Sequence, residues 1–399
     1  MAGSTETSSH IGAFFARCGL SPSPARSACH DFAAARFPPC LHVARPAPSQ
    51  GYCSYTLLVN DNLVLQFRPE HHRLKMGLAT LAVEVFDDLA PATEYLGTVE
   101  VRDEPTGKES SRQPPAGQDK AVGGLSDLPV LHAYSLKRIP GVSLAGYRCG
   151  RDRNLRDNSR EGLVRSFARL WARSWADAVP ASSGFEKGLV GTSMRRRLEM
   201  MMVLPEHFRP VVKSTLLHLD KIMLLPWVLS HGDLVPANIM VDPRTGHLSG
   251  LIDWAEAERL PFGVGLYGLE ELLGEDVPGV GFRYYADAEQ LRHAFWGELY
   301  AAIPDLGKTA SVSLLQAAQV AGILLWHGIA FDDGSLDRVV QEGRDEAELQ
   351  RLHSFLLEPL YLQDAPDQRD WTLTMFNCKG ALGRWRRACR FIFAKQCSD

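Results

Sequence analysis

The sequence lacks the hydrophobic segments of membrane and secreted proteins. Its longest apolar stretch, around VAGILLWHGIAF, is near twelve residues long, whereas a membrane-spanning helix needs about 20. The start, MAGSTETSSHIGAFFARCGL, has no basic region and only a short apolar run, so it does not predict a signal peptide. We therefore expect a cytoplasmic protein without stable membrane insertion.

Paired cysteines and an excess of positive charge are also missing. The eight cysteines include no Cys-x-x-Cys pair, so we expect free thiols rather than disulfides or a zinc site. The formal net charge is −4, which gives no general attraction to nucleic acid. Nucleic acid is therefore not an expected partner, and the sequence does not indicate an oligomeric state.

The composition is that of a globular protein that is too long for a single core. Apolar residues make up 45% and charged residues 23% of the 399 residues, which favours two compact parts. The local patterns predict an α+β fold in three segments. These are a helical leader over residues 1–50, a small β-rich lobe with one main helix over 51–139, and a larger, mainly helical lobe over 140–399.

The β-rich segment is predicted from turn residues and from the spacing of apolar residues. Strand-like runs at 55–59 and 63–67 flank Asn60-Asp61-Asn62, which is typical of a hairpin. Apolar residues from Leu74 to Val85 recur at helical spacing. Further strand-like runs lie on either side of a polar loop over 104–127, and Pro140-Gly141 marks the lobe boundary.

Several features of the helical half are open to two interpretations. Trp171 and Trp175 lie on an apolar helical stripe, which favours core packing over a ligand role. Four glutamates follow in the chain: Glu256, Glu258, Glu270 and Glu271. They either line an acceptor pocket for a cationic amino-alcohol or, as is more common, form a solvated helix face. The basic tail GRWRRACRFIFAKQC either lies on an anionic surface or docks on its own domain.

One loop in this half carries polar residues at fixed offsets. The stretch SHGDLVPANIMVD contains His231, Asp233 and Asn238, and the return segment LSGLIDW carries Asp253. Short apolar runs on both sides of the loop, with a turn at Gly246, predict a strand, a loop and a hairpin. We expect this arrangement to bring two carboxylates and one carboxamide to one edge of the structure.

Such a set of groups suits phosphoryl transfer from Mg-ATP to a hydroxyl group. Magnesium prefers oxygen ligands, which Asn238 and Asp253 offer. Asp233 is then left to orient the attacking hydroxyl and to take its proton. Asp233 and Asn238 alone would more often be a loop-capping pair, but Asp253 at this spacing favours the catalytic interpretation.

The motif resembles the catalytic and metal-binding loops of the aminoglycoside phosphotransferase and choline-kinase-like family, whose fold is protein-kinase-like. The family pattern is His-x-Asp-x-x-x-x-Asn, followed about 15 residues later by an apolar-Asp-aromatic triplet. The gap from Asn238 to Asp253 is 15. The segment YSLKRIPGVSL is similar to the family's hinge, so the order of features agrees over roughly residues 50–260.

The resemblance implies a role for each residue of the motif. Asp233 would be the catalytic base, Asn238 and Asp253 the magnesium ligands, and His231 a brace of the loop. The implied activity is an ATP- and magnesium-dependent phosphotransferase that acts on a hydroxyl of a small molecule, such as a secondary metabolite or an amino-alcohol.

The resemblance also implies a nucleotide site in the small lobe. Backbone amides around Gly51 and Ser54 would cover the phosphates. Backbone groups from Leu136 to Arg138 would meet the adenine edge.

The sequence departs from the family pattern at two points. The strand LVLQFRP has no lysine for the phosphates: Gln66 stands at that place and can only hydrogen-bond. Arg68 is either the phosphate cation, with Glu84 as its partner, or an edge residue. After the triplet, Pro261-Phe262-Gly263 replaces a turn whose acid braces the catalytic loop, and no aspartate follows it. These departures resemble a divergent, fungal-type branch.

Two alternatives to an active kinase remain open at this point. The first is a non-catalytic pseudokinase module that holds nucleotide, and the missing lysine favours this alternative. The second is an enzyme of the same fold that has been repurposed for other biosynthetic chemistry.

Overall fold

The computed structural model describes residues 2–37, 44–48, 50–101, 130–150, 153–332 and 335–358. The predicted loop over 104–127 and the basic tail lie outside the described residues. The chain forms two compact units. The first contains residues 1–141 and 249–255, and the second contains residues 142–248 and 256–399.

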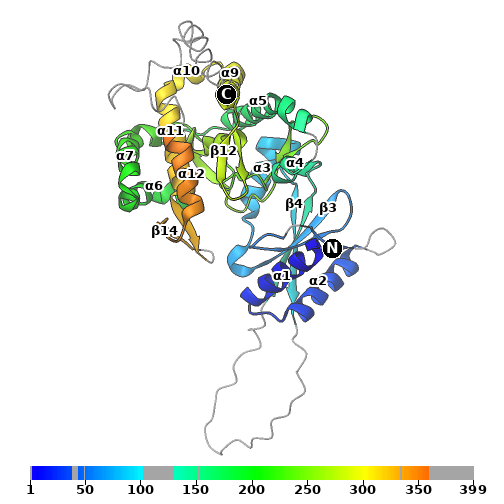
Figure 1. Ribbon diagram of the computed structural model, residues 1–399. Helices are drawn as coiled ribbons and strands as arrows, with labels where there is room; N and C mark the ends of the chain where they lie inside the picture. Colours follow the sequence, from blue (N-terminus) through cyan, green and yellow to red (C-terminus); the bar gives the residue numbers. More distant parts are fainter. Residues whose placement is uncertain are drawn as a thin grey trace, which may run out of the picture. The chain divides into compact units, whose positions relative to one another are not determined.

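An antiparallel five-stranded sheet forms the centre of the first unit (Figure 1). Its strand order is β1-β2-β3-β5-β4, with β1 at Arg45–Pro46, β2 at Tyr55–Leu58, β3 at Leu63–Pro69, β4 at Thr93–Glu100 and β5 at Val130–Lys137. Strands β2 and β3 pair in the register Tyr55↔Phe67, so the predicted hairpin is confirmed.

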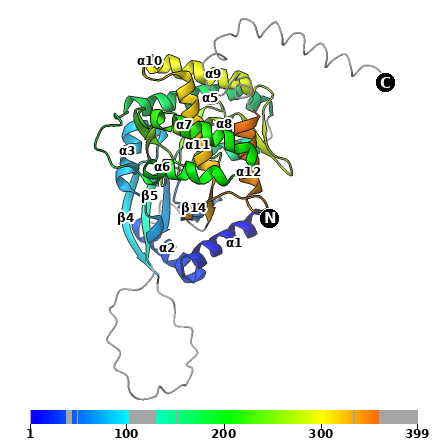
Figure 2. The ribbon, with the colours of Figure 1, turned by 90° about the vertical axis from the view of Figure 1, so that its left-hand side faces the viewer.

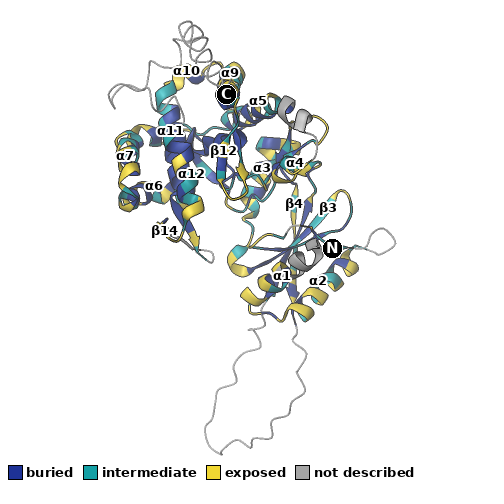
Figure 3. Cartoon of the chain, viewed as in Figure 1, coloured by how far each residue is buried: buried dark blue, intermediate teal, exposed yellow. Residues whose placement is uncertain are grey.

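Two helices of the leader share their core with this sheet. Helices α1 (Ala2–Arg17) and α2 (Pro22–Arg36) contact each other, and α2 contacts β4. The ring of Phe15 lies 5.0 Å from that of Tyr55, and both side chains are fully buried. Figure 3 shows exposed residues in yellow on the outer side of α2. The leader helices therefore bury one face against the sheet.

One α-helix lies within the described part of residues 51–139. This is α3 (Met76–Phe86), between the 3₁₀ turns η1 (Glu70–His72) and η2 (Asp87–Leu89). It follows the predicted apolar spacing, and it packs near β4. The return segment of the unit begins in β9 (Leu248–Leu251), where the indole N–H of Trp254 donates to the Leu251 carbonyl at 3.0 Å.

The second unit is mainly helical. Its α-helices are α4 (Leu144–Arg148), α5 (Arg153–Ala176), α6 (Leu189–Met200), α7 (Arg209–Met223), α8 (Gly268–Leu272), α9 (Ala288–Ala302), α10 (Leu306–Thr309), α11 (Val312–His327) and α12 (Glu346–Leu357). Its 3₁₀ turns are η3 (Met201–Val203), η4 (Glu206–Phe208) and η5 (Val264–Tyr267). Helix α11 contacts α6, α7 and α12, and Figure 2 shows these helices side by side.

Short strands complete the second unit. They are β6 (Val142–Ser143), β7 (Trp227–Ser230), β8 (Ile239–Val241), β10 (Glu258–Pro261), β11 (Gly274–Val277), β12 (Gly281–Tyr284), β13 (Ile329–Asp332) and β14 (Ser335–Val339). Strand β7 pairs with β10, β6 with β8, and β11 with β12. The β-rich N-terminal and helical C-terminal regions confirm the predicted α+β fold class.

The tryptophan stripe of α5 packs in the core of the second unit. Trp171 is 1% exposed and packs edge-on against Phe167. The Trp175 ring lies 4.8 Å from that of Phe262. Core packing, the favoured interpretation of these residues, is confirmed. Among the described residues, no helix is both long and apolar enough to cross a bilayer, and the described cysteines Cys18, Cys29, Cys53 and Cys149 are free.

The prediction that four glutamates form a solvated helix face is wrong for three of them. Glu258 is 5% exposed, Glu270 is 0% and Glu271 is 1%, whereas Glu256 is exposed. Glu258 accepts the backbone N–H of Val190 at 2.9 Å and that of Gly191 at 2.8 Å, at the N-terminus of α6. A carboxylate there satisfies amides that have no partner within the helix and complements its dipole.

The other two buried glutamates join separate elements of the second unit. Glu270 accepts from Arg292 at 2.6 Å, from the Tyr284 hydroxyl at 2.6 Å and from Gln319 at 3.1 Å. Glu271 accepts from Arg351 at 3.0 Å. Buried carboxylates need such partners because water no longer solvates them. Their internal contacts remove the sequence argument for a cationic acceptor.

Candidate functional site

The predicted catalytic loop begins where the buried strand β7 ends. All four residues of β7 are buried, which fixes the start of the loop at His231. Gly232 adopts φ +83°, and a Cβ at this position would lie 2.2 Å from the Glu256 carbonyl oxygen. Only glycine fits this backbone without strain. The loop is therefore held tightly at the residue that precedes Asp233.

Asp233 and Asn238 contact each other directly. The Asn238 Nδ2 group donates to Asp233 Oδ2 at 2.7 Å and to the Asp233 carbonyl at 3.0 Å. Both side chains are half-buried. Because Nδ2 is directed at Asp233, the amide oxygen Oδ1 is the atom of Asn238 that can act as an acceptor elsewhere. The loop thus brings together two of the predicted site residues.

His231 is buried at the base of the same loop. It is 2% exposed, and its Nδ1 accepts the backbone N–H of Asp233 at 3.2 Å. Nδ1 therefore carries no proton in this contact. This is the type of contact that a bracing histidine makes, and it keeps the ring within the loop.

Asp253 is held in the first unit by Arg68. Arg68 Nη2 lies 2.7 Å from Asp253 Oδ1, and its Nε donates to Gln66 at 3.1 Å. Arg68 is 1% exposed, whereas the Asp253 side chain is 33% exposed. Asp253 also adopts φ +63°, a conformation that Asp and Asn tolerate better than most residues.

The partner of Arg68 differs from the expected one. Glu84 is exposed on α3, and among the described residues the carboxylate that contacts Arg68 is that of Asp253. Because Gln66 and Arg68 lie two residues apart on one strand, their side chains share a face of the sheet. Arg68 therefore orients Asp253, and its predicted contact with phosphate stays a prediction.

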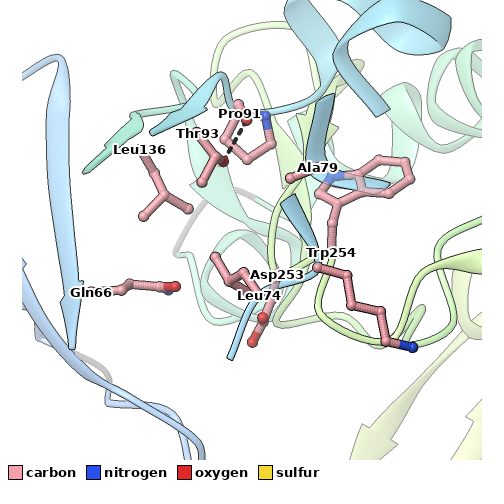
Figure 4. Close-up of a pocket in the computed structure, with 9 residues that line it drawn as sticks. Gln66, Leu74, Ala79, Pro91, Thr93, Leu136, Asp253 and Trp254 are labelled. Carbon is pink, nitrogen blue, oxygen red and sulfur yellow. Dashed lines mark hydrogen bonds between the residues drawn. The ribbon is translucent and has the colours of Figure 1, made fainter. Parts of the chain in front are cut away.

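A pocket in the first unit is lined by Gln66 and Asp253 (Figure 4). Its other lining residues are Leu74, Lys75, Ala79, Pro91, Thr93, Leu136 and Trp254. Figure 4 shows Gln66 and Leu136 projecting from the sheet toward the space beside Asp253. A mostly apolar pocket with a few polar groups is typical of small-molecule sites.

Lys75 and Trp254 are two of the pocket residues that were not predicted as site residues from the sequence. Lys75 is exposed and immediately precedes α3, so its ammonium is a cation in the pocket lining. From the sequence the phosphate cation was expected on a strand, and Lys75 is not on one. Trp254 is the aromatic member of the Asp-aromatic pair, and its ring lies 5.0 Å from that of Phe86. Its position next to Asp253 in the triplet was the sequence signal that could have indicated a place in the site.

The other predicted nucleotide contacts are untested by this geometry. Ser54 is buried, and its hydroxyl lies 3.3 Å from that of Thr56, whereas Gly51 is exposed. The backbone N–H groups of Lys137 and Arg138 donate to the Ala92 and Asn62 carbonyls at 2.8 Å each. In this conformation these two amides are engaged within the unit. Of the predicted adenine-edge residues, Leu136 lines the pocket.

The predicted metal ligands have suitable chemistry. Asn238 offers Oδ1, and Asp253 offers the oxygen Oδ2 that is not involved in its 2.7 Å contact with Arg68. Magnesium is commonly held by one or two such protein oxygens together with substrate phosphates. Within the described ranges no group of three or more His, Cys, Asp and Glu residues is arranged to hold a metal. Each residue therefore offers an oxygen of the kind that magnesium prefers, and their joint role as its ligands stays a prediction.

The second unit has a pocket of its own, away from the loop residues. It is lined by Leu144, Tyr147, Arg148, Ser159, Arg160, Leu163, Leu272, Glu275 and Tyr285. The guanidinium of Arg160 lies 3.6 Å from the centre of the Tyr285 ring. None of the residues 231–238 lines this pocket.

Comparison with known proteins shows that one segment of the chain is similar to a family model. Residues 130–263 match the model of the phosphotransferase enzyme family, and this segment includes His231, Asp233, Asn238 and Asp253. No curated protein matches the chain significantly in sequence.

Several solved structures show a low similarity to this chain. The GDP complex of wild-type aminoglycoside 2'-phosphotransferase-IIIa is 15% identical, with a TM-score of 0.44, over 73% of this chain and 86% of that chain. Aminoglycoside-3'-phosphotransferase of type VIII is 16% identical, with a TM-score of 0.40, over 73% and 97%. Aminoglycoside phosphotransferase APH(3'')-Id from Streptomyces rimosus is 14% identical, with a TM-score of 0.38, over 73% and 96%.

The match to the phosphotransferase enzyme family model is confined to residues 130–263, and this segment contains every residue of the predicted catalytic and metal-binding motif.

Proposed function

We propose that this protein is an ATP- and magnesium-dependent phosphotransferase that acts on a hydroxyl group of a small molecule. The observation that carries the proposal is the loop geometry, in which Asn238 holds the Asp233 carboxylate at 2.7 Å. The family match over residues 130–263 supports it. Two of the solved structures similar to this chain are described as a GDP complex and as a complex with ADP and streptomycin.

In the proposed reaction Asp233 acts as the base. It accepts a hydrogen bond from the acceptor hydroxyl and takes its proton while the oxygen attacks the γ-phosphorus of ATP. The bond between the γ-phosphorus and the β,γ-bridging oxygen breaks, so ADP leaves with that oxygen. The hydrogen bond from Asn238 Nδ2 fixes one carboxylate oxygen of Asp233 and so sets the direction of its carboxylate. Bound magnesium would neutralise charge on the phosphates.

The nucleotide is proposed to use the pocket of the first unit. Leu74, Ala79 and Leu136 supply apolar surface for a base, and Gln66 supplies a hydrogen-bonding group. Lys75 is proposed as the phosphate cation because its side chain is exposed in the pocket lining. Arg68 is 1% exposed and paired with Asp253, so we assign it the positioning of Asp253.

The acceptor class remains a small-molecule hydroxyl. An amino-alcohol was suggested by acidic residues that the structure places in the interior of the second unit: Glu258, Glu270 and Glu271. Their internal contacts give no support to a cationic acceptor over a neutral one.

The test is an ADP-release assay with purified protein, Mg-ATP and a panel of sugars, amines, amino-alcohols and polyols. We expect ADP release that requires both an acceptor and magnesium, and that stops when EDTA is added. A thermal shift with ATP but no ADP release with any acceptor would instead support the non-catalytic module, for which the missing strand lysine is the motivating observation. Product mass spectrometry that shows a modification other than a phosphate would support the repurposed enzyme.

A further inference from the structure

Two aromatic residues outside the motif contact the backbone on both sides of Asp233. The Tyr267 hydroxyl accepts the backbone N–H of Leu234 at 2.7 Å. The indole N–H of Trp326 donates to the Gly232 carbonyl. Gly232 and Leu234 are the immediate neighbours of Asp233. Two side chains therefore hold the backbone positions that determine where the Asp233 carboxylate points.

The two aromatic rings stack on each other. Their centroids are 4.6 Å apart, and the ring planes differ by 14°. Tyr267 is 1% exposed, and Trp326 is half-buried. Stacked aromatic side chains have few rotatable bonds and lose little further freedom when they make hydrogen bonds. The pair is thus a rigid support for two hydrogen bonds.

Close packing between elements holds the pair in place. A Cβ at Gly322 of α11 would lie 1.9 Å from the Val264 carbonyl oxygen of η5. Gly322 and Trp326 are four residues apart, so they lie on one face of α11. Only glycine at 322 permits this close approach, which brings Trp326 onto Tyr267. A Cβ at Gly268 would lie 2.7 Å from the Leu234 side chain, so the start of α8 packs equally closely against the loop.

We propose that Tyr267 and Trp326 are a positioning pair that sets the orientation of Asp233. They are not catalytic residues, because they act through the backbone of the loop. The pair supports the loop directly, and no aspartate follows closely after Pro261-Phe262-Gly263. Burial, and next the charge of Asp233, raise the pKa of Tyr267 well above its usual value, so its hydroxyl keeps its proton at neutral pH.

The activity arm of this inference rests on the proposed function, so its test has two independent measurements. The first is the hydrogen exchange rate of the Leu234 amide, which needs no turnover. The second is kcat and KM in the ADP assay. Tyr267→Phe removes one hydroxyl and keeps the ring, and Trp326→Phe removes the N–H donor and keeps a stacked ring.

Tyr284→Phe is the matched control. Tyr284 lies on β12, and its hydroxyl also makes a hydrogen bond within the second unit, to Glu270 at 2.6 Å. This variant measures what the loss of a comparable hydroxyl contact does to the whole unit.

We expect Tyr267→Phe to speed exchange of the Leu234 amide about tenfold, since one hydrogen bond is lost. Tyr267→Phe and Trp326→Phe should each lower kcat roughly tenfold or more, because small misplacements of a catalytic group are costly. KM for ATP should stay within about twofold. Tyr284→Phe should lower the denaturation midpoint while kcat and loop exchange remain at wild-type values.

Wild-type exchange and wild-type kcat in both aromatic variants would overturn the inference. So would an equal loss of kcat in Tyr284→Phe, since the effect would then be general destabilisation. If the wild-type protein releases no ADP with any acceptor, the proposed function fails, and the exchange measurement alone decides whether the pair holds the loop.

Discussion

The two aspartates of the motif are held in opposite ways. Asp253, in the first unit, is paired with the guanidinium of Arg68 at 2.7 Å. Asp233, in the second unit, accepts from the neutral amide of Asn238 at 2.7 Å, and its own backbone N–H donates to His231. One carboxylate is positioned by an opposite charge, and the other by neutral hydrogen bonds.

The difference suits the two proposed roles. The contact with Arg68 fixes one oxygen of Asp253, which benefits a metal ligand because a ligating carboxylate has to be held in one orientation. A general base has to be directed at the proton that it accepts. The contact with Asn238 directs the Asp233 carboxylate without adding a formal charge. The comparison predicts that the same substitution acts differently at the two positions.

The largest expected effect is a loss of kcat when Asp233 is substituted. Asp233→Asn keeps an oxygen that can accept from Asn238, but it removes the base. We expect kcat to fall about a thousandfold, within the range for loss of general-base catalysis, while the free energy of unfolding changes by less than about 0.5 kcal/mol. ADP release and urea denaturation measure the two quantities. A kcat within tenfold of wild type would remove Asp233 from the role of base.

The matched substitution of Asp253, which is paired with Arg68, should lower the free energy of unfolding. Asp253→Asn is tolerated at φ +63°, so it isolates the loss of charge beside the buried Arg68. We expect a loss of about 1–2 kcal/mol, less than for a fully buried pair because Asp253 is 33% exposed.

The control for this effect removes both charges at once. Arg68→Met combined with Asp253→Asn should recover part of the lost stability, since no unpaired cation remains. If Asp253→Asn proves as stable as the wild-type protein, the pair contributes no net stability. A magnesium-dependent ATP affinity that stays at its wild-type value in Asp253→Asn would contradict the metal-ligand role.

A smaller effect is expected at the cation of the first pocket. Lys75→Ala should weaken binding of Mg-ATP about three- to tenfold, the effect of one exposed charge near phosphate, with little change in stability. Arg73→Ala is the control, because Arg73 is a nearby exposed cation paired with Glu70 at 3.2 Å that does not line the pocket. Isothermal titration calorimetry measures the affinity for Mg-ATP. Equal losses in both variants would indicate a general effect of positive charge rather than a contact between Lys75 and phosphate.

The smallest expected effect is a change in pH dependence at Glu271. Burial raises the pKa of this carboxyl above its usual value of 4.5, although Arg351, His327 and Arg148 oppose the shift. The folded protein therefore binds a proton that the unfolded chain releases, so this group makes stability fall as pH rises above 4.5. In Glu271→Gln this contribution to the pH dependence of the unfolding free energy should be absent.

The measurement is the difference in unfolding free energy between variant and wild type. This difference, followed by urea denaturation between about pH 4.5 and 7, should rise with pH for Glu271→Gln. Asp276→Asn changes the other carboxylate that contacts Arg351, at 2.6 Å, and should leave most of the slope in place, because burial is the largest cause of the raised pKa of Glu271 and the charge of Asp276 is the last of the causes. A flat difference for Glu271→Gln would show that Glu271 is charged throughout this range.

Most of the fold could be predicted where local signals agree. The hairpin around Asn60–Asn62, the helix after Leu74 and the strand that ends at Ser230 follow turn chemistry and apolar spacing, which act within a few residues. The hairpin of β11 and β12 was not predicted, because residues 140–399 were expected to be mainly helical. Its turn region includes Gly279 and Gly281, which adopt positive φ.

The candidate site was predictable only in part, for a related reason. The offsets of Asp233 and Asn238 reveal a contact that a single loop can make. The partner of Arg68 is 185 residues away in sequence, and Glu84 was expected in its place because helix and strand are adjacent in the chain. The buried glutamates were misjudged because their cationic partners, such as Arg292 and Arg351, come from helices far along the chain.

The sequence by itself determined the strand, loop and return segment that carry Asp233, Asn238 and Asp253, because backbone geometry and short-range hydrogen bonds depend on neighbouring residues. Only the tertiary structure decided which groups support them. Arg68 reaches Asp253, and Trp326 reaches Gly232 from 94 residues away. Burial makes these contacts selective, because a buried charge or amide is stable only beside a matching partner, and packing decides which partner is near.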